Sequence, residues 1–321
     1  MVTAFPMALF VFAGRALTVG IGGALTLETA LAFLLALAAL PAAAHAASAI
    51  FGRGGIGSFD GALGKSLFAL LSFGTAVVAL YVAVMTVKGF SDFVSEAMFL
   101  RMPAFLVQAV FLGFCAYLSS CGFGTLRKFA LLAMILIVAV IGILFLVSLP
   151  ELKWEMIGDA FVFDSAVSPI GVARELGGIF APMAVAIIYL AAATLGKERG
   201  VSARSAAWAV VFSSVLLLVC YLNVALLLGL PFGSTQEYPY SSAVSTVTVG
   251  KLFARMEGFA YMMYFAAVAV RTSVCVSLFC LLFKGVLPAR LSERRAFGFM
   301  PSAVAAALLF VLTVTSFSPA S

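Results

Sequence analysis

Residues 129–149, FALLAMILIVAVIGILFLVSL, form an unbroken apolar run without a single charged side chain. About 20 such residues are needed for a helix to cross a hydrocarbon core about 30 Å thick. Comparable runs recur along the chain, near residues 4–24, 27–50, 63–87, 103–122, 125–149, 169–195, 204–231, 252–283 and 297–317. The sequence therefore predicts an all-α polytopic membrane protein with about nine spans, forming a single transmembrane domain over residues 1–321.

The composition of the whole chain agrees with lipid as its solvent. Of its 321 residues, 64% are hydrophobic and only 10% are charged, and the mean hydropathy is +1.20. Soluble domains carry about 25% charged residues, and only a lipid-facing surface tolerates so large a deficit. The net charge of +6 comes from short basic runs between the apolar segments. These basic residues form no continuous basic stripe and are not interleaved with aromatic residues that could stack on bases, so nucleic-acid binding is not expected.

The basic residues also predict how the chain is oriented. If the N-terminus is cytoplasmic, the inner loops hold eleven Lys and Arg and the outer loops hold five, as the positive-inside rule requires. The acidic segment ELKWEMIGDAFVFD, residues 151–164, then lies outside. Residues 88–103, KGFSDFVSEAMFLRMP, are apolar on one side and charged on the other. They predict a short interfacial helix after the third span, with Pro103 opening the fourth.

Few residues could carry catalysis or hold a metal. His45 is the single histidine and lies in the alanine-rich stretch PAAAHAAS, where a packed or interfacial side chain is the simplest interpretation. The five cysteines form no CxxC pair and lie mostly in apolar runs, as small buried hydrophobes do. Phosphate-binding glycine loops, GxSxG and HExxH are absent from the sequence. We therefore expect neither an enzyme nor a bound metal or cofactor, and we expect the first apolar run to remain as a membrane helix.

Two predicted spans look interrupted, which indicates a binding site. The first span reads FVFAGRALTVGIGGAL, and the sixth reads SPIGVARELGGIFAPMAVAIIYL. The helix-weakening residues are Gly14, Thr18, Gly20, Gly22 and Gly23 in the first span and Gly177, Gly178 and Pro182 in the sixth. A break frees backbone groups, which membranes tolerate only against protein or a wet cavity. Broken helices five spans apart are typical of inverted-repeat transporters with a midplane site, although glycine and proline also serve helix packing.

We therefore predict that a small zwitterion binds between residues 14–23 and 177–183. Backbone N–H groups at the start of a half-helix would face its carboxylate. Apolar cover would come from Phe12, Phe180 and Tyr264.

Arg271 is the most telling charge inside a span. It lies in AYMMYFAAVAVRTSVCVSLF with about twelve mostly apolar residues on either side, and Thr272 and Ser273 follow it. A central arginine costs at least about 2.5 kcal/mol unless it is paired or hydrated. It predicts either a structural ion pair or an electrostatic element of the site. Arg15 and Glu175 are further candidates, although Glu175 lies close to the predicted outer surface.

Several segments resemble the permease-like B subunits of bacterial spore germinant receptors. Residues 237–284 carry a Tyr-Pro element (Tyr238, Pro239), an Arg-x-Glu pair that opens a helix (Arg255, Glu257) and a mid-helix basic residue followed by hydroxyls. LGKSLFALLSF resembles the start of the family's third span, and VSLPELKWEMIGDAF resembles the loop after its fifth. LTVGIG and IFAPMAVAI resemble its broken first and sixth spans. The similarity runs in order through most of residues 5–315.

This resemblance implies a permease-like domain of the amino acid–polyamine–organocation superfamily, with a LeuT-like inverted repeat and broken helices 1 and 6. It also implies a small nutrient ligand such as an amino acid, partner A and C subunits, and a place in the inner membrane of the spore or the cytoplasmic membrane. An ion-conducting role is also attributed to such complexes. The family usually has ten spans, and its Gly-aromatic-Glu after the sixth-span break is replaced here by Ala184, Val185 and Ala186.

Two functions therefore stand side by side. One is a sensor subunit that binds a small amino acid and triggers germination. The other is a secondary amino-acid transporter coupled to H⁺ or Na⁺. Arg271 distinguishes the sensor from the transporter only weakly. Its fixed positive charge beside Thr272 and Ser273 could stand in place of the cation that a transporter would couple to.

Overall fold

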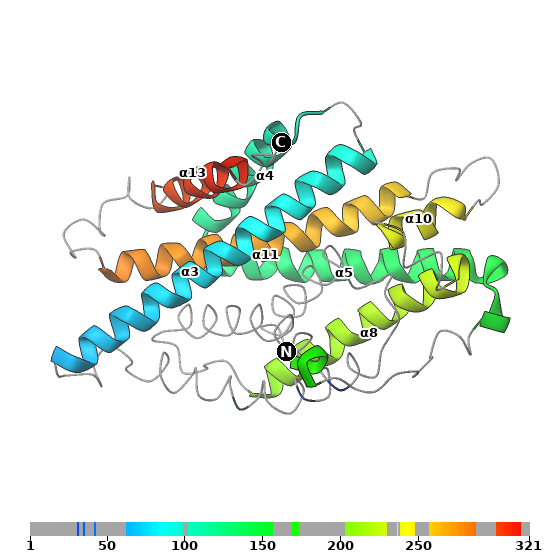
Figure 1. Cartoon of the computed structure of the whole chain (residues 1–321), viewed down its shortest axis with the longest axis horizontal. Helices are drawn as coiled ribbons and strands as arrows, with labels where there is room; N and C mark the ends of the chain where they lie inside the picture. Colours follow the sequence, from blue (N-terminus) through cyan, green and yellow to red (C-terminus); the bar gives the residue numbers. More distant parts are fainter. Residues whose placement is uncertain are drawn as a thin grey trace.

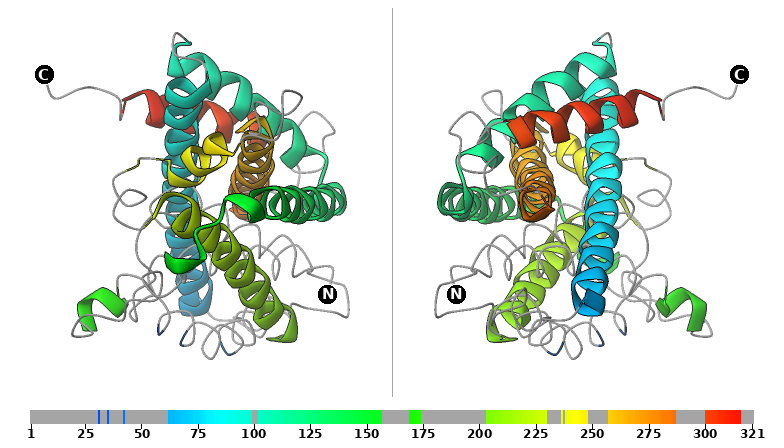
Figure 2. Two further views of the ribbon diagram at one scale, coloured as in Figure 1. Left: turned by 90° about the vertical axis from the view of Figure 1, so that its right-hand side faces the viewer. Right: turned by 90° about the vertical axis from the view of Figure 1, so that its left-hand side faces the viewer.

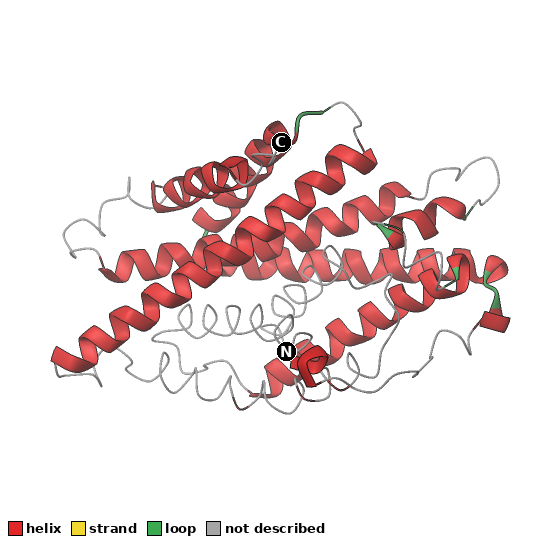
Figure 3. Ribbon diagram, viewed as in Figure 1, coloured by secondary structure: helices red, strands yellow, loops and turns green. Residues whose placement is uncertain are grey.

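The computed structural model describes residues 62–98, 102–156, 169–173, 203–229, 236, 238–247, 257–286 and 300–315, together with residues 31, 35 and 42. All regular secondary structure in this part of the chain is helical (Figure 3). The helices are α3 (Ala62–Phe93), α4 (Ala104–Ser120), α5 (Phe123–Ser148), α8 (Ala203–Leu228), α10 (Pro239–Thr246), α11 (Glu257–Val286) and α13 (Met300–Thr315).

Six of these helices confirm apolar runs that the sequence predicts as helices, namely the third, fourth, fifth, seventh, eighth and ninth. Within the described residues, four helices are long and apolar enough to cross a membrane: Phe73–Glu96, Phe123–Glu151, Val211–Leu228 and Gly258–Leu281. Ala104–Ser120 and Ser302–Thr315 are shorter apolar helices. The predicted first span, and nearly all of the second and the sixth, lie outside the described residues, so the predicted total of nine remains a prediction.

Helix α11 is the centre of this bundle. It lies between α3 and α5, with α4 and α13 on one side and α8 on the other (Figures 1 and 2). In its most apolar stretch 78% of the residues are buried, against 33–50% in the other three long spans. A helix that is buried on nearly all sides touches protein rather than lipid, which allows it to carry polar side chains.

Local sequence explains where several helices begin. Pro103 precedes α4 with extended backbone (φ −66°, ψ 128°), so this proline opens the fourth predicted span as expected. Gly122 separates α4 from α5 with φ +85°, a conformation that glycine adopts without steric cost. Pro239 occupies the first turn of α10, where its missing N–H costs nothing. The sequence did not predict α10 as a separate element.

The interfacial helix predicted within residues 88–103 was wrong. Helix α3 continues through Phe93, and a π-helical turn, Val94–Met98, follows directly. The apolar side of this stretch packs on protein rather than on the membrane surface, because Phe90 is 5% exposed and Phe93 is fully buried. Lys88, Asp92 and Glu96 share the opposite side, since they are four residues apart along α3 and the turn that follows it, which produces the same amphipathic pattern.

Buried polar side chains connect neighbouring helices. The Gln108 amide on α4 donates a hydrogen bond to the Ser91 hydroxyl on α3 over 3.0 Å. Similarly, the Asn223 amide on α8 donates to the Ser148 hydroxyl at the end of α5 over 3.2 Å. In hydrocarbon such bonds contribute about 0.6 kcal/mol on average, so they fix how the helices are positioned more than they stabilise the bundle.

Candidate functional site

The middle of α11 places polar groups deep inside the protein. Arg271 is 6% exposed, and Thr272 and Ser273 are fully buried. Arg271 lies near the midpoint of α11, about 20 Å from either end at 1.5 Å per residue. At that depth the guanidinium cannot reach the membrane surface, so the protein interior must accommodate a permanent positive charge.

These neighbouring residues point to different sides of the helix. Tyr264 and Cys275 lie on the same face of α11 as Arg271, since intervals of seven and four residues return to one side. Ser273 and Ser277 lie on a nearly opposite face, which packs against α4. Arg271 and Ser273, predicted together as one element, therefore act in different places.

The α4-facing side of α11 is held by a ladder of hydrogen bonds. The Ser277 hydroxyl donates to the Ser119 hydroxyl over 3.0 Å. One turn away, the Ser273 hydroxyl makes a long hydrogen bond of 3.5 Å to the Cys115 carbonyl. The Cys115 thiol is 3.9 Å from the Ala269 carbonyl, which accepts its weak hydrogen bond. Small residues allow this close approach of two membrane helices, so we assign Ser273 to packing.

The N-terminal part of α11 contributes to an aromatic cluster centred on Phe93 of α3. The Phe93 ring makes edge-to-face contacts with Tyr238, Tyr261 and Tyr264, at centroid distances of 4.9, 5.4 and 5.0 Å. Tyr240 meets Tyr264 edge-on at 6.5 Å. Such pairs contribute about 0.5–1.5 kcal/mol each beyond their buried area. The cluster therefore joins α3, α10 and α11 beside the Arg271 face.

One hydrogen bond closes this cluster at the protein surface. The Tyr238 hydroxyl donates to the carboxylate of Glu96, on the π-helical turn after α3, over 3.0 Å. The Tyr-Pro element of the sequence thus meets the end of α3, far from it in the chain.

Tyr240 adds a buried hydroxyl to the same region. Its side chain is fully buried, and within the part of the chain that the structure describes its hydroxyl meets only a weak hydrogen-bonding partner, the Cys220 thiol of α8. Burial raises the pKa of the Tyr240 phenol well above its ordinary range, so the hydroxyl stays protonated at physiological pH. It can therefore donate a hydrogen bond to an incoming polar group.

Only some of the residues predicted for the site belong to the part of the chain that the structure describes. These are Tyr264, Arg271, Thr272 and Ser273, of which the first two share a face of α11. The remaining predicted residues, Thr18, Gly20, Gly22, Gly177, Gly178, Phe180 and Pro182, lie outside the described residues and stay a prediction, as does Phe12.

Sequence reasoning missed Phe93, Tyr240 and Cys220, which lie beside the Tyr264 face. The sequence analysis singled out Tyr238 and Pro239, but nothing in the neighbouring sequence indicates that Tyr240 is buried. The Thr272 hydroxyl was predicted, and it is one of five buried side-chain polar atoms for which the described part of the chain offers no regular hydrogen bond. A buried oxygen of this kind calls for an explanation, for example a ligand or water.

Comparisons with known proteins bear on the family to which the chain belongs. A search of the curated proteins found no match. A family profile described as spore germination protein, of the spore permease family, matches residues 54–319. The match covers most of the chain and includes α3 to α13, with the buried Arg271 and the aromatic cluster. Together with the apolar helices it identifies an integral membrane protein, and the chain belongs to the spore permease family of spore germination proteins.

Proposed function

We propose that this chain is the permease-like subunit of a spore germinant receptor. It binds a small nutrient, an amino acid by preference, and triggers germination together with A and C subunits in the inner membrane of the spore. In this proposal its fold is a LeuT-like inverted repeat with helices 1 and 6 broken beside α11. The family match supports the link to germination.

The observation that carries the proposal is the burial of Arg271 on the face of α11 that also holds Tyr264. A buried cation attracts a carboxylate, and the neighbouring tyrosines offer apolar walls and a hydroxyl donor in Tyr240. A small zwitterion has the matching features, namely one carboxylate and a short side chain. Arg271 does not release its proton, so it cannot serve as a proton carrier in transport.

A fixed charge suits a sensor. The freed backbone carbonyls predicted near Thr18 and Gly20 would hold Arg271 in the resting state. A nutrient that binds one state better than the other would shift their populations and so transmit the signal. The secondary transporter coupled to H⁺ or Na⁺ is the competing function, and it requires net movement of the amino acid.

Two measurements separate these functions. Spores that lack this chain are exposed to single amino acids and to a non-nutrient trigger, with complemented spores as the control. We expect the response to one nutrient to be lost and the non-nutrient response to persist. The purified chain is also reconstituted in liposomes and tested for uptake of that nutrient under H⁺ and Na⁺ gradients. Concentrative uptake would favour the transporter, and an unchanged nutrient response would contradict the receptor.

A further inference from the structure

Helix α10 lies beside the C-terminal end of α8 and the N-terminal end of α11, and it packs on both (Figure 1). The orientation predicted from the sequence places it outside, in the loop between the seventh and eighth spans. At eight residues it is too short to be a stable helix alone. It therefore stays in place only through its contacts with neighbouring helices.

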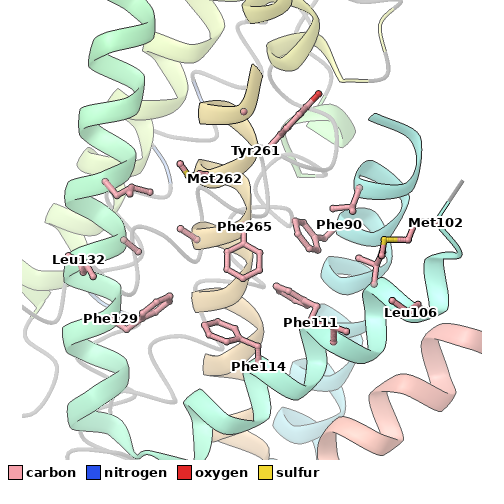
Figure 4. Close-up of a pocket in the computed structure, with 17 residues that line it drawn as sticks. Phe90, Met102, Leu106, Phe111, Phe114, Phe129, Leu132, Tyr261, Met262 and Phe265 are labelled. Carbon is pink, nitrogen blue, oxygen red and sulfur yellow. The ribbon is translucent and has the colours of Figure 1, made fainter. Parts of the chain in front are cut away.

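The end of α3 gives α10 a fixed support. Phe90, about one turn before Phe93, packs its ring on Phe111 of α4 and Phe265 of α11 (Figure 4), at centroid distances of 4.7 and 6.0 Å. Phe111 also meets Phe265 edge-on at 5.8 Å. Aromatic contacts thus join three helices just before the turn that carries Glu96. That turn can anchor a segment that moves.

Tyr238 fastens α10 to this support. It precedes Pro239, the first residue of α10. Its hydroxyl donates the 3.0 Å hydrogen bond to the carboxylate of Glu96, and its ring meets Phe93 edge-on at 4.9 Å. Glu96 is exposed and Tyr238 is half-buried. Water competes for both partners, so this hydrogen bond is weak enough to open and re-form.

The ring of Tyr240, on the first turn of α10, covers a buried thiol. Tyr240 and Cys220 of α8 are both fully buried, and their side chains are within hydrogen-bonding reach of each other. Tyr264 lies next to them, with its ring edge-on to that of Tyr240 at 6.5 Å. Tyr264 shares a face of α11 with Arg271. Because Tyr240 belongs to α10, a movement of α10 away from α8 uncovers Cys220 and opens the way toward this face.

The rest of α10 opposes such a movement only weakly. Its other buried side chains are small, namely Ser241, Ala243 and Val244, and small side chains bury little apolar area. The exposed Ser245 and Thr246 hydroxyls donate to carbonyls within α10 itself, over 2.8 and 2.7 Å. Elements with so few buried contacts open locally at far lower free energy than the whole protein unfolds.

We propose that α10 is a lid on the face of α11 that carries Arg271, closed in this structure and fastened to α3 by the hydrogen bond from Tyr238 to Glu96. When this bond breaks, α10 moves away from α8 and carries Tyr240 with it. The outer side of the protein then gains a path to Tyr264 and Arg271. The proposal goes beyond the receptor function, because the same lid would control access for a sensed or for a transported molecule.

Modification of Cys220 by N-ethylmaleimide measures how often the lid opens. The full-length chain is held in mixed micelles, and mass spectrometry follows the peptides that contain Cys220 and Cys115. Both thiols are fully buried, but Cys115 lies between α4 and the middle of α11 and reports unfolding of the bundle. Tyr238→Phe removes the hydrogen bond and keeps the ring. Ser245→Ala, which removes a hydroxyl that bonds within α10, is the matched control.

We expect Cys220 to react about three to ten times faster in Tyr238→Phe than in the unmodified protein, because the rate follows the population of the open lid. Glu96→Gln keeps an acceptor oxygen without the charge, so it should give a smaller increase. Cys115 should react slowly in every variant, and Ser245→Ala should match the unmodified protein.

Equal rates at Cys220 with and without the Tyr238 hydroxyl would overturn the proposal. Faster reaction at both Cys220 and Cys115 would also overturn it, since the hydrogen bond would then stabilise the whole bundle. The same acceleration in Ser245→Ala as in Tyr238→Phe would overturn it as well, because the loss would then lie in the stability of α10 and not in its attachment to α3.

Discussion

The Ser277 hydroxyl on α11 donates a hydrogen bond to the Ser119 hydroxyl on α4 over 3.0 Å, between residues 158 positions apart in the chain. Both side chains are buried. The bond belongs to the same interface as Ser273 and Cys115, and it lies on the side of α11 away from Arg271. Helix α11 thus has one face that holds it to α4 and a different face that carries Arg271 and Tyr264.

Replacing Ser277 with alanine should destabilise the protein slightly without changing its response to a nutrient. Hydrogen bonds between membrane helices average about 0.6 kcal/mol and reach about 1.7 kcal/mol. Unfolding in mixed micelles of Ser119→Ala, Ser277→Ala and the double variant gives the coupling energy directly. A coupling energy near zero would mean that the two hydroxyls do not interact.

Replacing Phe93 with alanine should be far more costly. Its ring is fully buried and contacts three tyrosines, so we expect a loss of about 3–5 kcal/mol from the cavity and the lost contacts. Phe105→Ala on α4 is the matched control, because Phe105 is 55% exposed and its loss should stay within about 0.5 kcal/mol. Equal losses in the two variants would show that the aromatic cluster does not stabilise the bundle.

Hydrophobic run length predicted the helices well, because a membrane helix satisfies its own backbone and needs only apolar side chains of sufficient number. The pattern failed after Lys88, since a helix that packs on protein and one that lies on the membrane surface show the same amphipathicity. Arg271 was recognisable because charge is rare inside a span. Phe93, Tyr240 and Cys220 were not, because their meeting depends on packing between α3, α8, α10 and α11, which one sequence does not specify.

Cysteine labelling tests the orientation. Cys121 is exposed at the end of α4, and Glu155 follows the opposite end of α5, a helix about 39 Å long. An impermeant thiol reagent added outside should label a cysteine at Glu155 and leave native Cys121 unlabelled. A cysteine at Arg199 should also be protected. Labelling of Cys121 and Arg199 with protection at Glu155 would reverse the predicted topology.

A bulky residue in the predicted break of the first span tests the ligand site. Gly20→Leu should abolish the nutrient response, because the added side chain fills the space predicted between residues 14–23 and 177–183. The variant should still insert, since leucine favours a membrane helix. Immunoblotting of membranes gives its abundance, and germination in nutrient gives its response. An undiminished response at normal abundance would place the site elsewhere.

Germination of spores that carry Arg271→Met tests the central claim most directly. Methionine fits the volume but removes the charge that faces the Tyr264 side of α11, so the account predicts loss of the nutrient response or failure to fold. Arg271→Lys keeps the charge without the forked geometry and should retain part of the response. Ser273→Ala, on the α4 side, should leave the response intact. If Arg271→Met spores respond fully to the nutrient at normal abundance of the protein, the account of a ligand site on this face of α11 is contradicted.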